Sequence, residues 1–426
     1  MPEYRCYQLQ FAAVGLLLAI AAGAWAAAPA KKPVKKEMSV NVVDFGAKGD
    51  GVTDNTAVFQ KALNAVGKAG GGTVSVPAGR YLIKSHLEFP QRVAMVGVSQ
   101  AVNNGRPPSG SILLAVEGAG KPDGPPFIFL GTDCVLKGMT IHYPKQGDKN
   151  LKPYPWTVRG HGDNISIIDV QMINPWQAVD FGTNPCGRHL IRNLYAWPMY
   201  RGIFIDKCYD CGRIENVHLW PFGGEGGDIM PFVNKNGIAF IIGKTDWEYM
   251  YNCFCIGYSV GYHFIRTEAG NANVVLTQCG SDVGPIAVLV EDCQYHAGIS
   301  FLNGQIMAGV VIKDTNTGPV KFTNCGFWGY EPITDSHVKL AGSGQLTVNA
   351  CHFVAWDQKE KNGAPAIYAE SGSLIVNGCD FMDGKKQMYL GPKVESAVIT
   401  GNRLRGGEQI VNESKGDVQI GLNAGK

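Results

Sequence analysis

Acidic and basic side chains gather in the middle of the sequence, each close to the end of a short apolar run. Paired carboxylates can act as general acid and base on a glycosidic bond, and cationic side chains can bind the negative groups of an acidic sugar polymer. We therefore take Asp180, Asp206 and Asp246 as candidate catalytic residues. The candidate substrate-binding residues are Arg159, His161, Lys244, Trp247, Glu248, Arg266 and Glu268.

The most unusual stretch is GKTDWEY, residues 243–249. If this stretch is extended, the alternation of a strand places Asp246 and Glu248 on one face together with Lys244. Trp247 and Tyr249 then offer aromatic surface on which a sugar ring can stack. The Gly-rich insertion just before it, residues 221–236, is a candidate lid over this region.

Cysteine spacing predicts no metal site. Cys208 and Cys211 form a lone C-x-x-C and Cys253 and Cys255 a C-x-C, but no second pair lies at zinc-site spacing. The chain has 12 cysteines, and five of them occupy one equivalent position of the repeat described next. A free cysteine in such a position behaves as a small core residue, so we expect an unbridged ladder of cysteines.

A short repeat must bring the candidate residues together. Its pattern is apolar, any, small turn-former, apolar, any, apolar, and the turn-former is Gly, Asn or Asp in every copy but one. These residues adopt a left-handed backbone at low cost, so the pattern predicts two short strands that meet at a corner once per coil. The interval before Cys293 is long enough to hide one further coil. The ten best copies centre on Met139, Val170, Leu194, Val217, Cys253, Cys293, Cys325, Cys351, Cys379 and Asn402.

Stacking of these coils predicts an all-β fold, a right-handed parallel β-helix of about 10–12 coils. Each strand pairs in parallel with its counterpart about 4.8 Å away in the next coil. Candidate carboxylates would then lie about 5 Å apart on adjacent coils and about 10 Å apart two coils away, which brackets the separations of retaining and inverting glycosidases. A third strand follows most corners, at residues 179–181, 203–206, 238–242, 262–266 and 299–303.

One amphipathic segment is suited to cover the open end of such a stack. Residues 54–66 predict a helix that Asp54 caps and that Gly70, Gly71 and Gly72 follow. Its apolar face would consist of Val58, Phe59, Ala62, Leu63 and Val66.

The N-terminus predicts export. Residues 1–28 combine Arg5, an apolar run and three alanines, as in a cleaved signal peptide, and a Lys- and Pro-rich linker follows at residues 29–38. The expected working protein is a single domain, residues 39–426, that is secreted or periplasmic and has no membrane span after signal removal. Its charges are nearly balanced, which argues against a nucleic-acid partner.

Residues 41–83 resemble the opening segment of the pectate-lyase-like superfamily, which also holds rhamnogalacturonases, polygalacturonase relatives and mannuronan epimerases. The resemblance implies a parallel β-helix fold and a polysaccharide partner. Polygalacturonases carry N-T-D, D-D, G-H-G and R-I-K in that order, and this chain has only G-H-G, at residues 160–162. The resemblance rests on Asp44, Phe45, Gly46, Gly49, Asp50, Gly51, Asp54, Gly70, Gly71, Gly72, Pro77, Gly79 and Tyr81.

Three functions follow from this reading. The first is a secreted glycoside hydrolase that acts on an acidic, pectin-like polysaccharide through paired carboxylates. The second is a polysaccharide lyase or uronate epimerase in the same groove, assisted by calcium, with Arg266 as base. The third is a carbohydrate-binding or structural β-helix without turnover. We expect no obligatory cofactor, with calcium as the one ion to test, and a monomer or a homotrimer.

Overall fold

The computed structural model describes residues 38–99, 108–147, 151–220, 229–329, 335–358 and 363–425. The chain from Glu37 onward forms one compact unit. The predicted signal peptide, and the predicted linker up to residue 37, lie outside the described residues. Among the described residues, no helix is long and apolar enough to cross a membrane.

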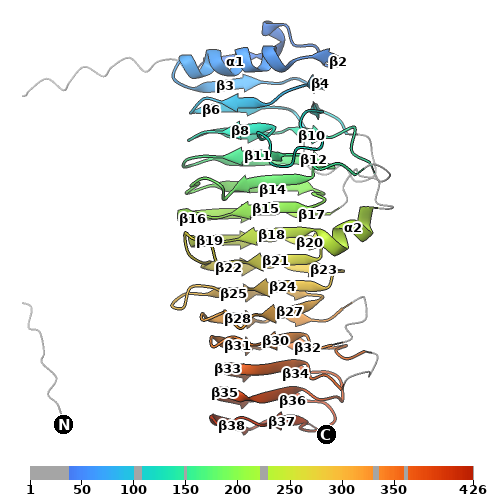
Figure 1. Ribbon diagram of the computed structural model, residues 1–426, viewed down its shortest axis with the longest axis vertical. Helices are drawn as coiled ribbons and strands as arrows, with labels where there is room; N and C mark the ends of the chain where they lie inside the picture. The colour runs from blue at the N-terminus through green and yellow to red at the C-terminus, as the bar shows by residue number, and fades with distance from the viewer. Residues whose placement is uncertain are drawn as a thin grey trace, which may run out of the picture. The chain divides into compact units, whose positions relative to one another are not determined.

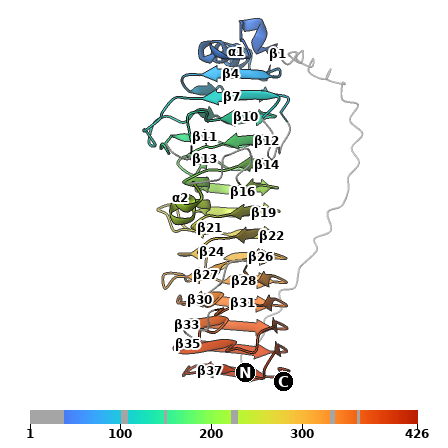
Figure 2. The same ribbon diagram turned by 90° about the vertical axis from the view of Figure 1, so that its right-hand side faces the viewer.

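Short strands wind around one axis and pair in parallel with their counterparts in the next coil, as Figures 1 and 2 show. This arrangement confirms the predicted right-handed parallel β-helix. Each coil runs from a strand of ladder A through a corner to ladder B, then to ladder C, and back through a turn to ladder A.

The strands of the three ladders are as follows. Ladder A contains β1 (Met38–Asn41), β3 (Gly72–Ser75), β6 (Val93–Val96), β9 (Val135–Lys137), β12 (Ser166–Ile173), β14 (Leu190–Ala196), β16 (Cys208–Glu215), β19 (Thr245–Tyr251), β22 (Val274–Thr277), β25 (Ile299–Leu302), β28 (Val320–Thr323), β31 (Gln345–Asn349), β33 (Ile367–Asn377), β35 (Met388–Thr400) and β38 (Asp417–Gly421). Ladder B contains β2 (Asp50–Asp54), β4 (Gly79–Ile83), β7 (Ser111–Ala115), β10 (Thr140–His142), the ends of β12 and β14, β17 (His218–Leu219), β20 (Phe254–Ile256), β23 (Gly280–Asp282), β26 (Gln305–Ile306), β29 (Gly326–Phe327), β32 (His352–Phe353), β34 (Asp380–Phe381) and β36 (Arg403–Leu404). Ladder C contains β5 (Leu87–Phe89), β8 (Ile128–Leu130), β11 (Trp156–Gly160), β13 (Gln177–Phe181), β15 (Arg201–Ile205), β18 (Ile238–Ile242), β21 (Val260–Phe264), β24 (Ile286–Val290), β27 (Gly309–Ile312), β30 (Val338–Leu340), the starts of β33 and β35, and β37 (Ile410–Asn412). Within the described residues the stack has more coils than the 10–12 expected.

The corner residues between ladders A and B adopt the left-handed backbone that the repeat predicts. Asn193, Asn216 and Asn252 have φ of 53°, 51° and 50°. Their side-chain amides also bond from coil to coil, because Asn216 donates to Asn193 at 2.8 Å and Asn252 donates to Asn216 at 2.9 Å. The corner therefore selects Asn for its backbone conformation and for the ladder that its side chain forms.

One predicted corner is wrong. Asp292, the residue before Cys293, has no positive φ, whereas Gln278 and Asn303 have φ of 55° and 54°. Two corners therefore replace the one placed at Cys293, and the hidden coil is centred on Cys279. For the same reason the predicted third strand at 299–303 is β25, which belongs to ladder A. The ladder C strand of the coil centred on Cys279 is β24.

Replacement of a corner asparagine should lower stability measurably. Asn216→Ala removes the side-chain hydrogen bonds of Asn216 to the neighbouring coils. It also places alanine, whose Cβ atom disfavours a positive φ, at φ 51°. We therefore expect a loss of about 1–2 kcal/mol in the free energy of unfolding. Asn216→Gly removes the same hydrogen bonds but tolerates the backbone. Urea unfolding should rank the alanine variant below the glycine variant, and the reverse order would contradict the backbone argument.

The core fills the space between the three ladders with stacked apolar side chains. Phe327, Phe353 and Phe381 stack face to face on successive coils, with ring centroids 4.4 and 4.7 Å apart. The described cysteines are all free, and only Cys211 is not fully buried. The expectation of an unbridged cysteine core therefore holds for the part of the chain described.

A helix covers the N-terminal end of the stack, at the top of Figure 1. Helix α1 (Thr56–Lys68) follows the 3-10 turn η1 (Val42–Phe45), and the Asp54 side chain accepts a hydrogen bond from the Thr56 amide at 3.0 Å. Phe59, Ala62, Leu63 and Val66 are buried, whereas Val58 is only partly buried. The predicted capping segment is therefore confirmed, with the helix displaced by two residues.

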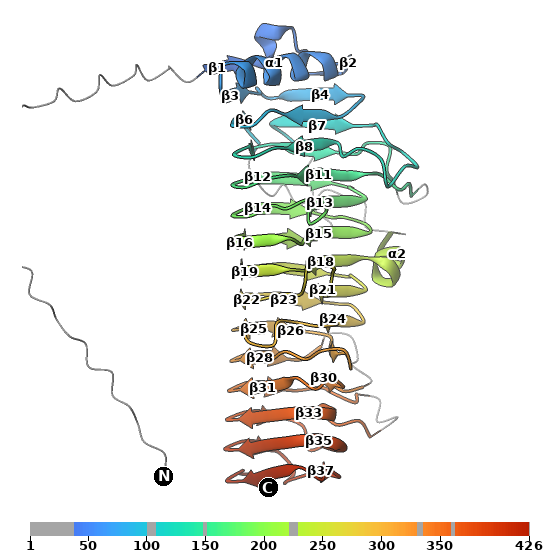
Figure 3. The ribbon, with the colours of Figure 1, turned by 60° about the vertical axis from the view of Figure 1, so that its left-hand side comes forward.

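The predicted lid region contains a second helix. Residues 221–228 lie outside the described residues, and α2 (Ile229–Asn236) forms the remainder beside β18 and β20 (Figures 1 and 3). Ile229 and Val233 of α2 are buried.

Candidate functional site

The turn from ladder C to ladder A collects the predicted charged residues on one edge, which we call the charged edge. Strands β11, β13, β15, β18 and β21 pair in that order, so the residues that follow them come from successive coils. Ile242 pairs with Phe264, and Lys244 and Arg266 each follow two residues later. These two cations therefore occupy equivalent positions on adjacent coils.

Asp180 is buried, and both of its carboxylate oxygens are occupied. Its side chain is 0% exposed and accepts hydrogen bonds from Arg159 Nε at 2.6 Å, from the Gly182 and Thr183 amides, and from the Thr183 hydroxyl. A carboxylate with four donors stabilises a turn and has no oxygen left for a substrate in this conformation. The catalytic role of Asp180 remains a prediction that this geometry does not favour.

Asp206 is also nearly buried, at 3% exposure. Its Oδ1 accepts from the Lys244 amide at 2.6 Å and from the Thr267 hydroxyl at 3.0 Å. Gly243 allows this close approach, because a Cβ there would lie 2.6 Å from Asp206 Oδ1. Asp206 thus joins three consecutive coils, and its catalytic role likewise remains a prediction.

Asp246 is the exposed carboxylate of the three. Its side chain is 50% exposed and forms an ion pair with Lys244. On the adjacent coil Arg266 is 71% exposed and lies 3.4 Å from the buried carboxylate of Asp292. Lys244, Asp246 and Arg266 therefore present both signs of charge to solvent on neighbouring coils.

Of the remaining predicted edge residues, Glu268 and His161 are exposed and Arg159 is not. Glu268 follows Arg266 on the same turn, and His161 follows β11, where its amide donates to Leu130 O at 3.0 Å. Arg159 is mostly buried because it serves Asp180.

Glu248 does not share the face of Lys244 and Asp246, so this part of the prediction is wrong. Glu248 is 1% exposed and lies inside the β-helix. The register of the two strands shifts just before Glu248, because β16 has one residue more than β19 between the pairs Cys208–Thr245 and Cys211–Trp247. Asp246 and Trp247 therefore both face outward, and the alternation that follows is shifted by one residue.

An aromatic row lies beside the charged edge on the outer face of ladder A. It consists of Trp247, Tyr249 and Tyr251, which are 54%, 42% and 52% exposed. Alternate residues of a strand are about 6.6 Å apart, comparable with the length of a pyranose ring. Arg213, which pairs with Tyr249, is exposed beside the row. The row therefore offers an exposed aromatic surface, with the cation of Arg213 beside it, next to Asp246.

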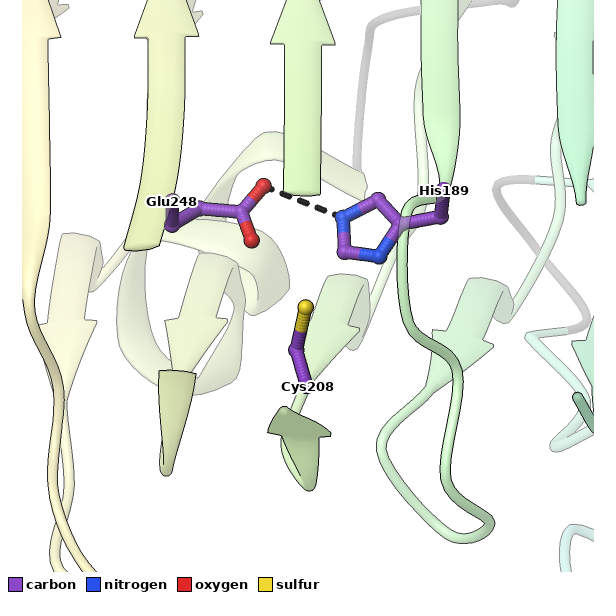
Figure 4. A group of neighbouring side chains, drawn as sticks. All are labelled: His189, Cys208 and Glu248. Atoms are coloured by element: carbon purple, nitrogen blue, oxygen red, sulfur yellow. Dashed lines mark hydrogen bonds and ion pairs between the residues drawn. The ribbon is translucent and has the colours of Figure 1, made fainter. Parts of the chain in front are cut away.

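Inside the same coils, His189, Cys208 and Glu248 point toward one another (Figure 4). Their nearest ligand atoms all lie within 4.8 Å of one another, and His189 Nε2 is 3.0 Å from Glu248 Oε1. Burial alone would lower the pKa of His189, but the Glu248 carboxylate and the Cys208 sulfur raise it well above its usual value. Among the described residues, this is the one group of three or more His, Cys, Asp or Glu side chains close enough together to hold a metal ion. Its nitrogen and sulfur donors do not suit calcium, which prefers oxygen.

Sequence reasoning missed several members of these groups. Tyr251 and Arg213 continue the alternation of β19 and β16, so the periodicity that gave Trp247 would have found them. His189 has no such signal, since it lies in a turn and meets Glu248 only through coil stacking.

The comparisons with known proteins agree with the family resemblance of the opening segment. Residues 39–106 match the family model described as rhamnogalacturonase A/epimerase, pectate lyase-like. Mannuronan C5-epimerase AlgE4 of Azotobacter vinelandii is 32% identical over 133 residues, 30% of this chain and 21% of that protein. Alginate lyase 7 of the same organism is 59% identical over 46 residues, 11% of this chain and 5% of that protein. The chain thus matches about a fifth or less of the length of these relatives.

Solved structures show the same fold over nearly the whole chain. The A-module of mannuronan C-5 epimerase AlgE6 from Azotobacter vinelandii superposes with a TM-score of 0.53 and 17% identity, over 91% of this chain and 99% of that chain. The N-terminal fragment of bacteriophage Phi29 gene product 12 superposes with a TM-score of 0.59 and 14% identity, over 91% and 70%. These matches confirm the parallel β-helix fold.

Proposed function

We propose that this chain binds a uronate-containing polysaccharide along the aromatic row and acts on it beside the Lys244–Asp246 ion pair, by β-elimination or epimerisation. The observation that carries the proposal is the joining of the two features on β19. Trp247, the first residue of the row, directly follows Asp246. A sugar ring stacked on Trp247 would therefore place its substituents beside the exposed carboxylate of Asp246, the partly buried ammonium group of Lys244 and the exposed side chain of Arg266.

Each residue of this site has a chemical role in the proposed reaction. Lys244 and Arg266 neutralise the uronate carboxylate, which makes the proton on the neighbouring carbon more acidic. Asp246 takes that proton as general base. In elimination the electron pair of the broken C–H bond forms a carbon–carbon double bond, the glycosidic C–O bond breaks, and the leaving oxygen takes a proton from water. In epimerisation the resulting carbanion takes a proton from water on the opposite face of the ring, and Asp246 releases its own proton to solvent.

Hydrolysis, our first expectation from the sequence, is the second candidate. It needs two accessible carboxylates on either side of the glycosidic bond. Asp246 is accessible, whereas Asp180 and Asp206 accept hydrogen bonds from backbone amides inside the turns. Hydrolysis by the predicted catalytic aspartates would therefore require Asp206 to leave its donors, and this requirement favours elimination or epimerisation.

The named relatives support the substrate class. An alginate lyase and mannuronan C5-epimerases match the opening segment, although over a small part of their length.

We further propose a secreted or periplasmic location after removal of residues 1–28, and a monomer or homotrimer in solution.

The test is a panel of alginate, polygalacturonate and neutral polysaccharides. Elimination produces an unsaturated sugar that absorbs in the ultraviolet, hydrolysis produces reducing ends alone, and epimerisation changes the uronate composition seen by NMR without shortening the chain. Binding without any of these products would leave only the non-catalytic function. Absence of both binding and turnover on every uronate polymer would contradict the proposal. Chelator followed by calcium or zinc would show whether an ion is needed and which one.

A further inference from the structure

We propose that His189, Cys208 and Glu248 form an internal binding site for a divalent transition metal, with zinc as its first occupant. His189 precedes β14, Cys208 begins β16 and Glu248 lies in β19, so three neighbouring coils each supply one ligand (Figure 4). The three side chains are fully buried and differ in donor type. The inference is independent of the proposed function, because the site faces the interior and the aromatic row faces solvent.

The histidine is already oriented for this role. His189 Nδ1 lies 3.0 Å from the carbonyl oxygen of Cys186, which can only accept, so Nδ1 carries a proton and donates it. Nε2 then faces Glu248 and the sulfur of Cys208. A ligating histidine commonly donates its other ring N–H to a carbonyl in this way, because the contact fixes both the tautomer and the ring orientation.

The glutamate has an unused oxygen. Glu248 Oε1 contacts His189, but within the described part of the chain Oε2 has no hydrogen-bond partner although it is buried. An unpartnered buried carboxylate oxygen is costly, and a cation in contact with it would remove that cost.

A glycine keeps space open at the cluster. Gly212 pairs with Glu248 across the β16–β19 ladder, and a Cβ on Gly212 would lie 2.1 Å from Glu248 Oε2 and 2.5 Å from His189 Nε2. Any other residue at this position would therefore collide with two of the three ligands.

The donor set selects the kind of ion. A thiolate, a carboxylate and a neutral imidazole carry two negative charges, which a divalent cation balances inside the core. Nitrogen, sulfur and oxygen donors together are typical of zinc sites, and bidentate binding by Glu248 would supply a fourth donor atom. The metal would tie three coils together directly beneath the aromatic row.

The experiment measures metal bound to the full chain. Protein purified without chelator, or titrated with zinc after chelator treatment, should hold about one zinc per chain by elemental analysis. Cobalt substitution should give a near-ultraviolet thiolate-to-cobalt charge-transfer band, which reports a Cys–metal bond directly. Failure of the wild-type chain to bind either ion, or binding of cobalt without that band, would overturn the proposal.

Matched variants identify the ligands. Cys208→Ser should abolish stoichiometric zinc binding, whereas Cys253→Ser, in which a buried cysteine of the core is changed, should retain it. Glu248→Gln keeps the shape of the side chain and should weaken zinc binding at least about 100-fold, since loss of an outer-shell partner alone costs about 10- to 100-fold. Full zinc binding by Cys208→Ser would overturn the site. Sugar binding or turnover that persists in these variants would leave the metal inference intact.

Discussion

Asp246→Asn is expected to lower kcat by about 100- to 1,000-fold on the polysaccharide that the wild-type protein turns over. General base catalysis by a positioned carboxylate contributes about that much, and the asparagine amide cannot accept the substrate proton. KM should change little, because the stacking surface of the aromatic row is intact. Initial rates at several polymer concentrations separate the two constants.

Two further variants make this result specific. Asp380→Asn removes a surface carboxylate that is also paired with an arginine, Arg403, and should leave kcat unchanged. Asp206→Asn should lower the free energy of unfolding by about 1–3 kcal/mol, because Asp206 bonds the Lys244 amide and Thr267. If correctly folded Asp206→Asn loses as much kcat as Asp246→Asn, Asp206 is a catalytic residue.

Loss of the aromatic row is expected to weaken polysaccharide binding strongly. Aromatic contacts contribute about 1 kcal/mol each beyond the area that they bury, so the double variant Trp247→Ala with Tyr249→Ala should bind about 30-fold more weakly. Affinity electrophoresis or calorimetry measures this without turnover, so the prediction also applies to a non-catalytic carbohydrate-binding protein.

The matched control for the row is another exposed tyrosine. Tyr295 is 78% exposed and lies outside the aromatic row. Tyr295→Ala should leave the affinity unchanged. Equal losses in the Tyr295 variant and in the double variant would show that binding is not localised to β19.

The fold was predictable because its information is local. Each corner needs a residue that tolerates a positive φ, and Asn193, Asn216 and Asn252 mark their corners in the sequence. The error at Cys293 arose because Asp292 and its apolar neighbours match the pattern by chance. Gln278 at the true corner is not a usual turn-former, so nothing in its type revealed it.

The site was only partly predictable because side-chain direction is not local. A strand-end aspartate can face solvent, as Asp246 does, or turn onto backbone amides, as Asp180 does, and the two look alike in sequence. The inward position of Glu248 accompanies a shift of register against the neighbouring strand β16. The meeting of Glu248 with His189 depends in turn on the register of three coils.

The capping helix and the aromatic row should contribute independently to the stability of the stack. Each strand pairs only with those of the coils directly before and after it, so the molecule approximates a one-dimensional chain of nearest-neighbour couplings. Helix α1 lies against the first coils, many coils from Trp247. Substitutions of Leu63 and of Trp247 should therefore have additive effects on the free energy of unfolding in a double-mutant cycle. Weakening the cap would fray the first coils and leave sugar affinity as it was.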